Sequence, residues 1–267
     1  MRRGSLAFFT TTSLVGAVLF GCSGSGSGSS GDGGTSVNTD AANTDAANTT
    51  PPVIRHLGFD VERYDSATGF AGGFDFENFL TVQKTSKPFV EFGGMFIWGE
   101  GPANRGTTYE WDLKLRPDAQ IYSLFDGVVV RLDSDPQHGD FELGLRPASD
   151  SSWQLVLDHL SNLLVDVGDS VAAGEPLASP GNYVFEISLM QDAGPDADTL
   201  YCMLDYFDPA LKEDAGQKLA DLMGDWETYL ITNSVPLDPV SGVTNPQDLY
   251  DEAAMTVPGC LLSSHKE

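Results

Sequence analysis

Few side chains in this sequence combine a reactive type with a suggestive spacing. The chain has four histidines, His56, His138, His159 and His265. His159 ends an apolar run, and His138 lies among turn residues between Asp135 and Asp140. Histidine and carboxylate side chains are the usual ligands of zinc, and hydrolysis by one zinc ion needs three protein ligands plus an open position for water. No Gly-x-Ser-x-Gly motif occurs, so the serine chemistry of that motif is not expected.

Residues 1–21 are typical of a secretory signal peptide. Arg2 and Arg3 precede an apolar stretch from Leu6 to Phe20. As a helix this stretch would be about 22 Å long, which is short for the ~30 Å hydrocarbon core of a bilayer. It ends at Cys22 in a segment that resembles the bacterial lipobox, although Phe20 is bulkier than the usual residue there. We expect an acylated Cys22 as the mature N-terminus; the alternative is an ordinary signal peptide with an incidental cysteine.

Residues 22–50 are predicted to be a flexible tether. The segment has no aromatic residue, opens as a Gly/Ser tract and closes in two copies of Asn-Thr-Asp-Ala-Ala. Such a composition buries too little apolar surface to offset the entropy of ordering, and its r.m.s. reach would be roughly 30 Å. An acylated Cys22 would anchor the tether in a lipid bilayer. Ser23 after it favours the outer membrane, facing the periplasm or the cell surface, if Gram-negative sorting applies.

Composition excludes one class of partner and indicates a folded domain. Asp and Glu number 39 against 14 Lys and Arg, a formal net charge of −25. Nucleic acid is excluded as a partner, because phosphate recognition needs clustered cations. Hydrophobic residues make up 41% of the chain, enough for a core. Besides Cys22 the cysteines are Cys202 and Cys260, which in an oxidising exported compartment pair most simply with each other.

Residues 51–209 are predicted to form an antiparallel β-sandwich or barrel-like domain. Phe70 to Phe92 indicates short irregular strands, and short β-branched or alternating runs separated by turn residues follow. The expected strands are 120–123, 127–133, 141–146, 153–158, 163–167 and 183–189. The continuous apolar triplet Val128–Val130 suggests a strand buried on both faces.

Residues 210–267 are predicted to be a helical extension followed by an irregular tail. Apolar residues from Leu211 to Leu230 fall at spacings of three and four, the stripe of an amphipathic helix. Asp208 suits the N-terminal cap, with Pro209 in the first turn. The stripe is expected to pack on the β domain rather than to bind a partner. Four prolines beyond Asn233 argue against a further helix, so the tail is expected to wrap the domain surface, tied by the disulfide.

Three segments, in order, resemble the lysostaphin-type (LytM-like) zinc endopeptidases, which cut peptidoglycan cross-bridges and have a duplicated hybrid motif fold. Tyr109–Val130 is similar to the family stretch from the first metal motif to its "DGVV" turn. Leu155–Ser161 is similar to the strand ending in "HLS", and Val165–Leu177 to the "V-x-V-G-D-x-V-x-x-G" hairpin. Gly181–Ile187 stands where the family has its "H-x-H-F-E" strand. The resemblance covers 89–209 and implies a mainly β fold.

The resemblance also implies a degenerate active site. The family takes its zinc ligands from H-x-x-x-D and from the second histidine of H-x-H. The corresponding positions here hold Thr108, Asp112 and Val184. Of the two supporting histidines of the family, one is retained as His159 and the other is replaced by Asn182. One carboxylate cannot hold Zn²⁺ at useful affinity, so no zinc cofactor is expected unless His138, Glu110 or Glu186 rebuilds the site.

The sequence therefore favours a non-catalytic LytM-like envelope lipoprotein. Such a protein would bind peptidoglycan or a cell-wall amidase as an adaptor in cell-wall remodelling, as non-catalytic relatives do. Tyr109, Trp111, Trp153 and Tyr183 are candidates to line a peptide groove, with core packing as the alternative for each. The first rival hypothesis is an active peptidoglycan metalloendopeptidase with relocated zinc ligands. The second is a structural surface lipoprotein.

Overall fold

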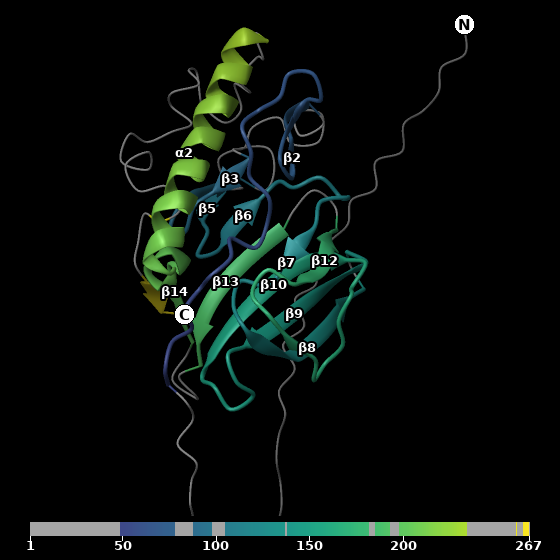
Figure 1. Cartoon of the computed structure of the whole chain (residues 1–267), viewed down its shortest axis with the longest axis vertical. Helices are drawn as coiled ribbons and strands as arrows, with labels where there is room; N and C mark the ends of the chain where they lie inside the picture. Colours follow the sequence, from purple (N-terminus) through teal and green to yellow (C-terminus); the bar gives the residue numbers. More distant parts are fainter. Residues whose placement is uncertain are drawn as a thin grey trace, which may run out of the picture. The chain divides into compact units, whose positions relative to one another are not determined.

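Antiparallel pairing dominates the part of the chain that the structure describes (Figure 1). The structure is a computed structural model, and it describes residues 49–77, 88–97, 105–136, 138–181, 185–192, 198–233, 260 and 264–266. All belong to one unit of the chain, residues 45–267. The predicted signal peptide, Cys22 and the tether up to residue 48 lie outside the described residues.

Eleven strands of the described residues join in one sheet. Its main path runs β11-β8-β9-β10-β13-β14-β15, with β6 pairing with β13 and β3, and β12 pairing with β10 and β7. The strands are β3 (Phe89–Val90), β6 (Trp111–Leu113), β7 (Ile121–Tyr122), β8 (Gly127–Asp135), β9 (Asp140–Arg146), β10 (Trp153–Ser161), β11 (Ser170–Val171), β12 (Pro176–Pro180), β13 (Phe185–Gln191), β14 (Thr199–Tyr201) and β15 (Ser264–Lys266). Two further hairpins stand apart, β1 (Phe70–Ala71) with β2 (Phe74–Asp75), and β4 (Met95–Ile97) with β5 (Arg105–Thr107).

Alternation along the central strands explains which face is buried. On β10, Leu155 and Leu157 are buried, and Leu157 lies opposite both Leu143 of β9 and Ile187 of β13. Directly opposed residues of antiparallel strands project to the same face. These leucines and Ile187 therefore form the core layer. Asp158 follows Leu157 and Glu186 precedes Ile187, so both carboxylates project from the opposite face of the sheet.

The helix α2 (Pro209–Thr232) matches the predicted amphipathic stripe. The Asp208 carboxylate accepts a hydrogen bond from Ala210 N and caps the helix as expected. The buried side of α2 packs on the segment of β1 and β2, where Trp226 meets Phe76 edge to face with ring centroids 4.9 Å apart. At the edge of this interface, Arg63 donates two hydrogen bonds, of 2.6 and 2.8 Å, to the Asp225 carboxylate. The described residues include no helix long and apolar enough to cross a membrane.

The fold class is confirmed, a mainly antiparallel β domain with a helix near its C-terminus, while two local expectations are wrong. Residues 163–167 are not a strand. The Asp169 carboxylate accepts a hydrogen bond from Asp166 N in a turn, and Leu164 and Val167 face solvent. In the triplet 128–130 only Val129 is buried, because the strand alternates between the core and a partly open face.

The predicted disulfide is present between Cys202 and Cys260, with their Cα atoms 5.9 Å apart. It ties a residue next to β14 to the last part of the chain, where β15 adds a strand by pairing with β14. The predicted irregular path of residues 234–259 lies outside the described residues.

Candidate functional site

Five carboxylates form a row across one face of the sheet. Asp112 of β6 lies opposite Glu186 of β13, and Glu186 lies opposite Asp158 of β10. Leu157 of β10 lies opposite Leu143 of β9, so Asp158 and Glu142 are the next residues on these neighbouring strands, at the start of a bulge that ends at Leu160. Glu142 in turn lies opposite Asp133 of β8. We call Asp112, Glu186, Asp158, Glu142 and Asp133 the carboxylate row. It runs from a buried end at Asp112 to an exposed end at Asp133.

Like charges placed directly opposite one another destabilise a sheet, and three basic side chains offset them. Lys114 Nζ bonds Asp112 Oδ1, and these side chains are 0% and 1% exposed. At the other end Arg131 contacts Glu142 and lies 3.5 Å from Asp133. In the middle, His159 Nε2 lies 3.9 Å from Glu186 Oε2.

Burial and mutual repulsion shift the titration of this cluster. Burial first, then the charge of Glu186 and a hydrogen bond to it, raise the pKa of Glu110 to about 8. Burial, followed by the charge of Asp112, also raises the pKa of Glu186. Glu110 therefore holds a proton at neutral pH and donates it in a hydrogen bond to the Glu186 carboxylate. The two side chains behave as one carboxyl pair that shares a proton.

His159 sits beside this pair in an unusual backbone conformation. Its φ is +59°, in the left-handed region, within the bulge of β10. Burial lowers the pKa of His159, but the hydrogen bond from its Nδ1 to Asp140 Oδ2 (2.8 Å) and the charges of Asp158 and Glu186 outweigh burial, so the net shift is upward. Asp140 thereby orients the ring and leaves Nε2 directed towards Glu186.

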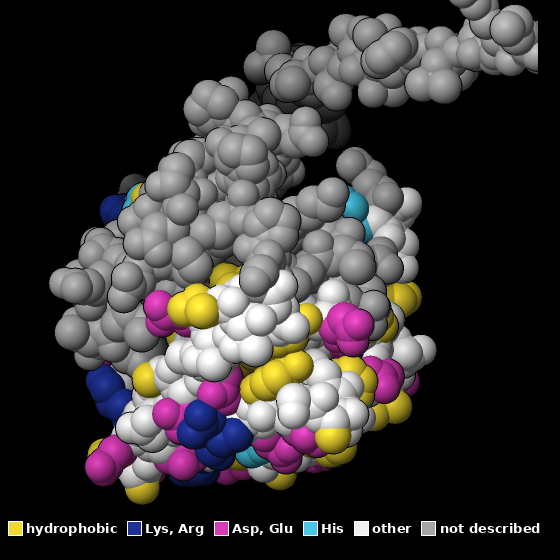
Figure 2. All heavy atoms as spheres, turned by 90° about the horizontal axis from the view of Figure 1, so that it is seen from above, with side chains coloured by type: hydrophobic (Ala, Val, Ile, Leu, Met, Phe, Trp, Pro, Cys, Tyr) yellow, Lys and Arg dark blue, Asp and Glu magenta, His cyan; other side chains and the backbone are white. Residues whose placement is uncertain are grey.

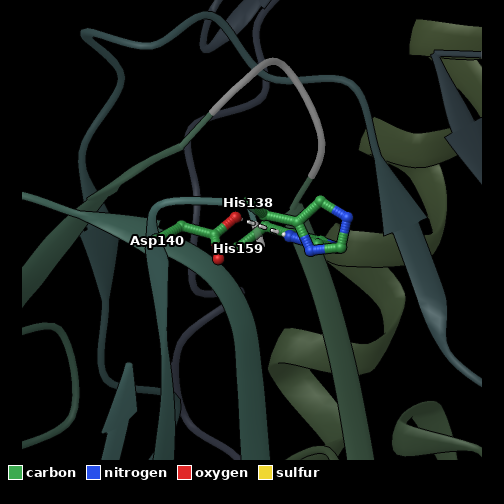
Figure 3. Close-up of side chains that lie close together, drawn as sticks. All are labelled: His138, Asp140 and His159. Carbon is green, nitrogen blue, oxygen red and sulfur yellow. Dashed lines mark hydrogen bonds and ion pairs between the residues drawn. The ribbon is translucent and has the colours of Figure 1, made fainter. Parts of the chain in front are cut away.

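A second group of potential ligands adjoins the carboxylate row. His138, Asp140 and His159 each place one ligand atom within 4.8 Å of the others, and Figure 3 shows Asp140 joined to His159 with the His138 ring beside them. His138 comes from the turn between β8 and β9, Asp140 begins β9, and His159 comes from β10. The rings of His138 and His159 meet edge to face, with centroids 5.5 Å apart.

Of the three positions expected from the sequence to correspond to zinc ligands, the structure describes Thr108 and Asp112. The Thr108 hydroxyl accepts a hydrogen bond from Glu110 N at 3.2 Å, so it serves the local turn. Asp112 is present, but an ammonium group contacts one of its oxygens, and a second cation there would be repelled. Val184 and Asn182 lie outside the described residues. His159 lies near Asp112, and its charge opposes the rise in the pKa of the Asp112 carboxyl that burial causes.

Two of the expected groove aromatics are core residues. Trp111 is 1% exposed and packs edge to face with Phe89, and Trp153 is 4% exposed and donates its indole N–H to Thr49 O at 2.8 Å. Core packing, the alternative interpretation, therefore describes both tryptophans. Tyr109 is half-buried and stacks on His265 of β15, and Tyr183 lies outside the described residues.

Sequence reasoning noted His138, Glu110 and Glu186 but missed Lys114 and Asp140. It considered that His138 could turn towards Asp112, whereas the structure places His138 beside Asp140 and His159. A lysine between Leu113 and Leu115 was a usable signal for Lys114, because a lysine buried among apolar residues needs a carboxylate partner. Nothing local marked Asp140, because its burial depends on strand pairing.

Part of the chain is similar to several solved structures of peptidases. No protein-family profile matches it. It is similar to the solution structure of lysostaphin, with 20% identity and a TM-score of 0.33 over 40% of this chain and 46% of that chain. It is also similar to LytU (22%, TM-score 0.34, 41% and 77% of the two chains) and to a zinc-containing peptidase from Vibrio cholerae (18%, 0.31, 51% and 38%). The matches span under half of the lysostaphin and Vibrio cholerae chains.

Proposed function

We propose that this chain is an exported lipoprotein, anchored in the outer membrane through an acylated Cys22, whose β domain binds a cell-wall ligand without cutting it. The observation that carries the proposal is the buried ion pair between Lys114 and Asp112. It places a fixed positive charge against the one ligand that the resemblance to lysostaphin-type endopeptidases retains. A hydrolytic zinc ion at that position would need two further protein ligands and room beside Asp112.

The remaining features of the cluster suit recognition. The side chains of Glu186, Glu142 and Asp133 are 24%, 31% and 64% exposed, and Arg131 adds a cation at the open end of the row. Peptide stems of the cell wall carry both amino and carboxylate groups, which such a mixed row can pair with. Side chains of the row are held by strand register, so little entropy is lost on binding. The proposed ligands are peptidoglycan or a cell-wall amidase.

On the face that Figure 2 shows, the acidic side chains of the described residues are spread out. In Figure 2 acidic side chains are scattered among hydrophobic and neutral ones over the described face. Diffuse negative charge near anionic envelope polymers disfavours nonspecific adherence. Binding then depends on the ordered row rather than on the net charge of −25.

Sedimentation of the full chain with purified peptidoglycan, and pull-down with purified cell-wall amidases, tests the proposal. We expect capture by one of them, with no release of soluble fragments from peptidoglycan. Glu142→Lys should weaken capture at least fivefold, whereas Asp214→Lys on the exposed side of α2 should not change it.

Two outcomes would replace the proposal by its rivals. Digestion of peptidoglycan that a chelator abolishes would identify an active metalloendopeptidase with relocated zinc ligands. Absence of capture by peptidoglycan and by amidases would leave a structural surface lipoprotein.

A further inference from the structure

We propose that His138, Asp140 and His159 form a binding site for a divalent transition-metal ion of the zinc class, separate from the Lys114–Asp112 pair. This inference goes beyond the proposed binding function and does not rest on it. The ligand atoms of the three residues lie within 4.8 Å of one another. Two imidazole nitrogens and one carboxylate oxygen are a donor set that zinc, cobalt and nickel favour, and calcium and magnesium do not.

Asp140 supplies an independent observation that points to a cation. Its side chain is 4% exposed, and one oxygen accepts the His159 Nδ1 hydrogen bond. The other oxygen, Oδ1, is buried and has no hydrogen-bond partner among the residues that the structure describes. A buried carboxylate oxygen without a partner is costly, and a metal ion beside it would satisfy its remaining charge.

The hydrogen bonds of the two histidines place them differently in the proposed site. The His138 ring places Nδ1 2.7 Å from Asp135 Oδ2, and the His159 ring places Nδ1 2.8 Å from Asp140 Oδ2. Carboxylates that bond one ring nitrogen fix the ring and leave the other nitrogen as a donor atom, the usual outer contact of a metal-bound histidine. His138 therefore has an outer carboxylate partner in Asp135, whereas His159 Nδ1 and Asp140 Oδ2 face each other as two ligand atoms between which a metal ion would replace the proton.

The backbone of His159 adopts a left-handed conformation at the site. Among the described residues other than glycine, only His159 and Asn162 have a positive φ, +59° and +48°. Left-handed backbone at such residues is strained and gathers at functional positions. The turn brings His159 out of the strand alternation and towards Asp140 on the neighbouring strand (Figure 3).

Closing the site requires a small movement of one residue. With zinc–ligand bonds of 2.0–2.2 Å, tetrahedral ligand atoms lie about 3.3 Å apart, less than the present 4.8 Å limit. His138 can make this movement, because its side chain is 58% exposed and lies in the turn before β9. Asp140 and His159 are set in paired strands and provide the fixed half of the site.

Titration of the full chain in detergent with Co²⁺, followed by visible absorption, tests the inference. We expect one equivalent to bind with the strong bands of a four-coordinate site and to be displaced by Zn²⁺. His138→Ala and Asp140→Asn should each weaken binding at least tenfold, and His265→Ala, a histidine outside the site, should leave it unchanged. His138 is exposed, so its variant tests the site without threatening the fold.

The outcomes separate this inference from the proposed function. No Co²⁺ spectrum, or binding that is unchanged in His138→Ala, would overturn the metal site and leave the binding function intact. Metal binding together with chelator-sensitive digestion of peptidoglycan would support the metal site and overturn the non-catalytic function. Metal binding without digestion supports both.

Discussion

Lys114 and Asp112, two residues apart on and just after β6, form an ion pair in which both side chains are shielded from solvent. Alternation along the strand places them on the same face of the sheet. Desolvation alone would make either charge unfavourable there, and burial does raise the pKa of Asp112 although Lys114 opposes that shift. Each charge therefore depends on the other.

Lys114→Met should destabilise the protein by about 3–5 kcal/mol, because it leaves the Asp112 charge buried without its counter-ion. The midpoint of urea unfolding measures the effect. The double variant Lys114→Met, Asp112→Leu should recover most of the loss, since both charges are then gone. Lys212→Met removes an exposed pair with Asp205 and should cost no more than about 1 kcal/mol. Equal losses in the two single variants would contradict the burial argument.

Glu110 should make stability fall as pH rises. Its pKa is about 8 in the folded protein against an ordinary value of 4.5. Between these values the folded state binds a proton that the unfolded state has released, so stability is complete at the lower limit and is lost towards the upper one. Glu110→Gln keeps a hydrogen-bond donor and cannot ionise, so its unfolding midpoint should decline less over this range than that of the wild type.

A matched control for the pH experiment is Glu213→Gln, on the exposed side of α2. It should follow the wild-type profile. Parallel profiles for the wild type and Glu110→Gln would show that Glu110 does not hold a proton in the folded state.

Opening the disulfide between Cys202 and Cys260 should cost about 4 kcal/mol, the chain-entropy value for a closed loop of this size. The bridged residues are 58 positions apart. Denaturation of Cys260→Ser, compared with the wild type with and without reductant, measures the cost. The reduced wild type should match the variant, and a variant as stable as the oxidised wild type would contradict the contribution of the bridge.

Cys22→Ala should release the protein from membranes, because acylation at Cys22 is the proposed anchor. Fractionation of cells into membrane and soluble parts, with a blot for the protein, provides the measurement. Ser25→Ala, a change in the same tether, should leave the protein in the membrane fraction. A Cys22→Ala form that still sediments with membranes would refute lipid anchoring.

The antiparallel class and the amphipathic helix with its Asp208 cap followed from the sequence alone, because apolar periodicity and capping chemistry are local. The cysteine pairing followed because Cys202 and Cys260 are the two cysteines besides Cys22. That Thr108 and Val184 replace two zinc ligands is implied by the resemblance and stays a prediction.

Tertiary structure decided which charges meet. The five members of the carboxylate row are spread from residue 112 to 186, and only strand register and one bulge bring them to a common face. Burial likewise assigned Trp111 and Trp153 to the core and raised the pKa of Glu110. The pairing of neighbouring strands placed His138 near Asp140 and His159. Strand pairing and desolvation depend on residues distant in the chain, so spacing along the sequence does not contain them.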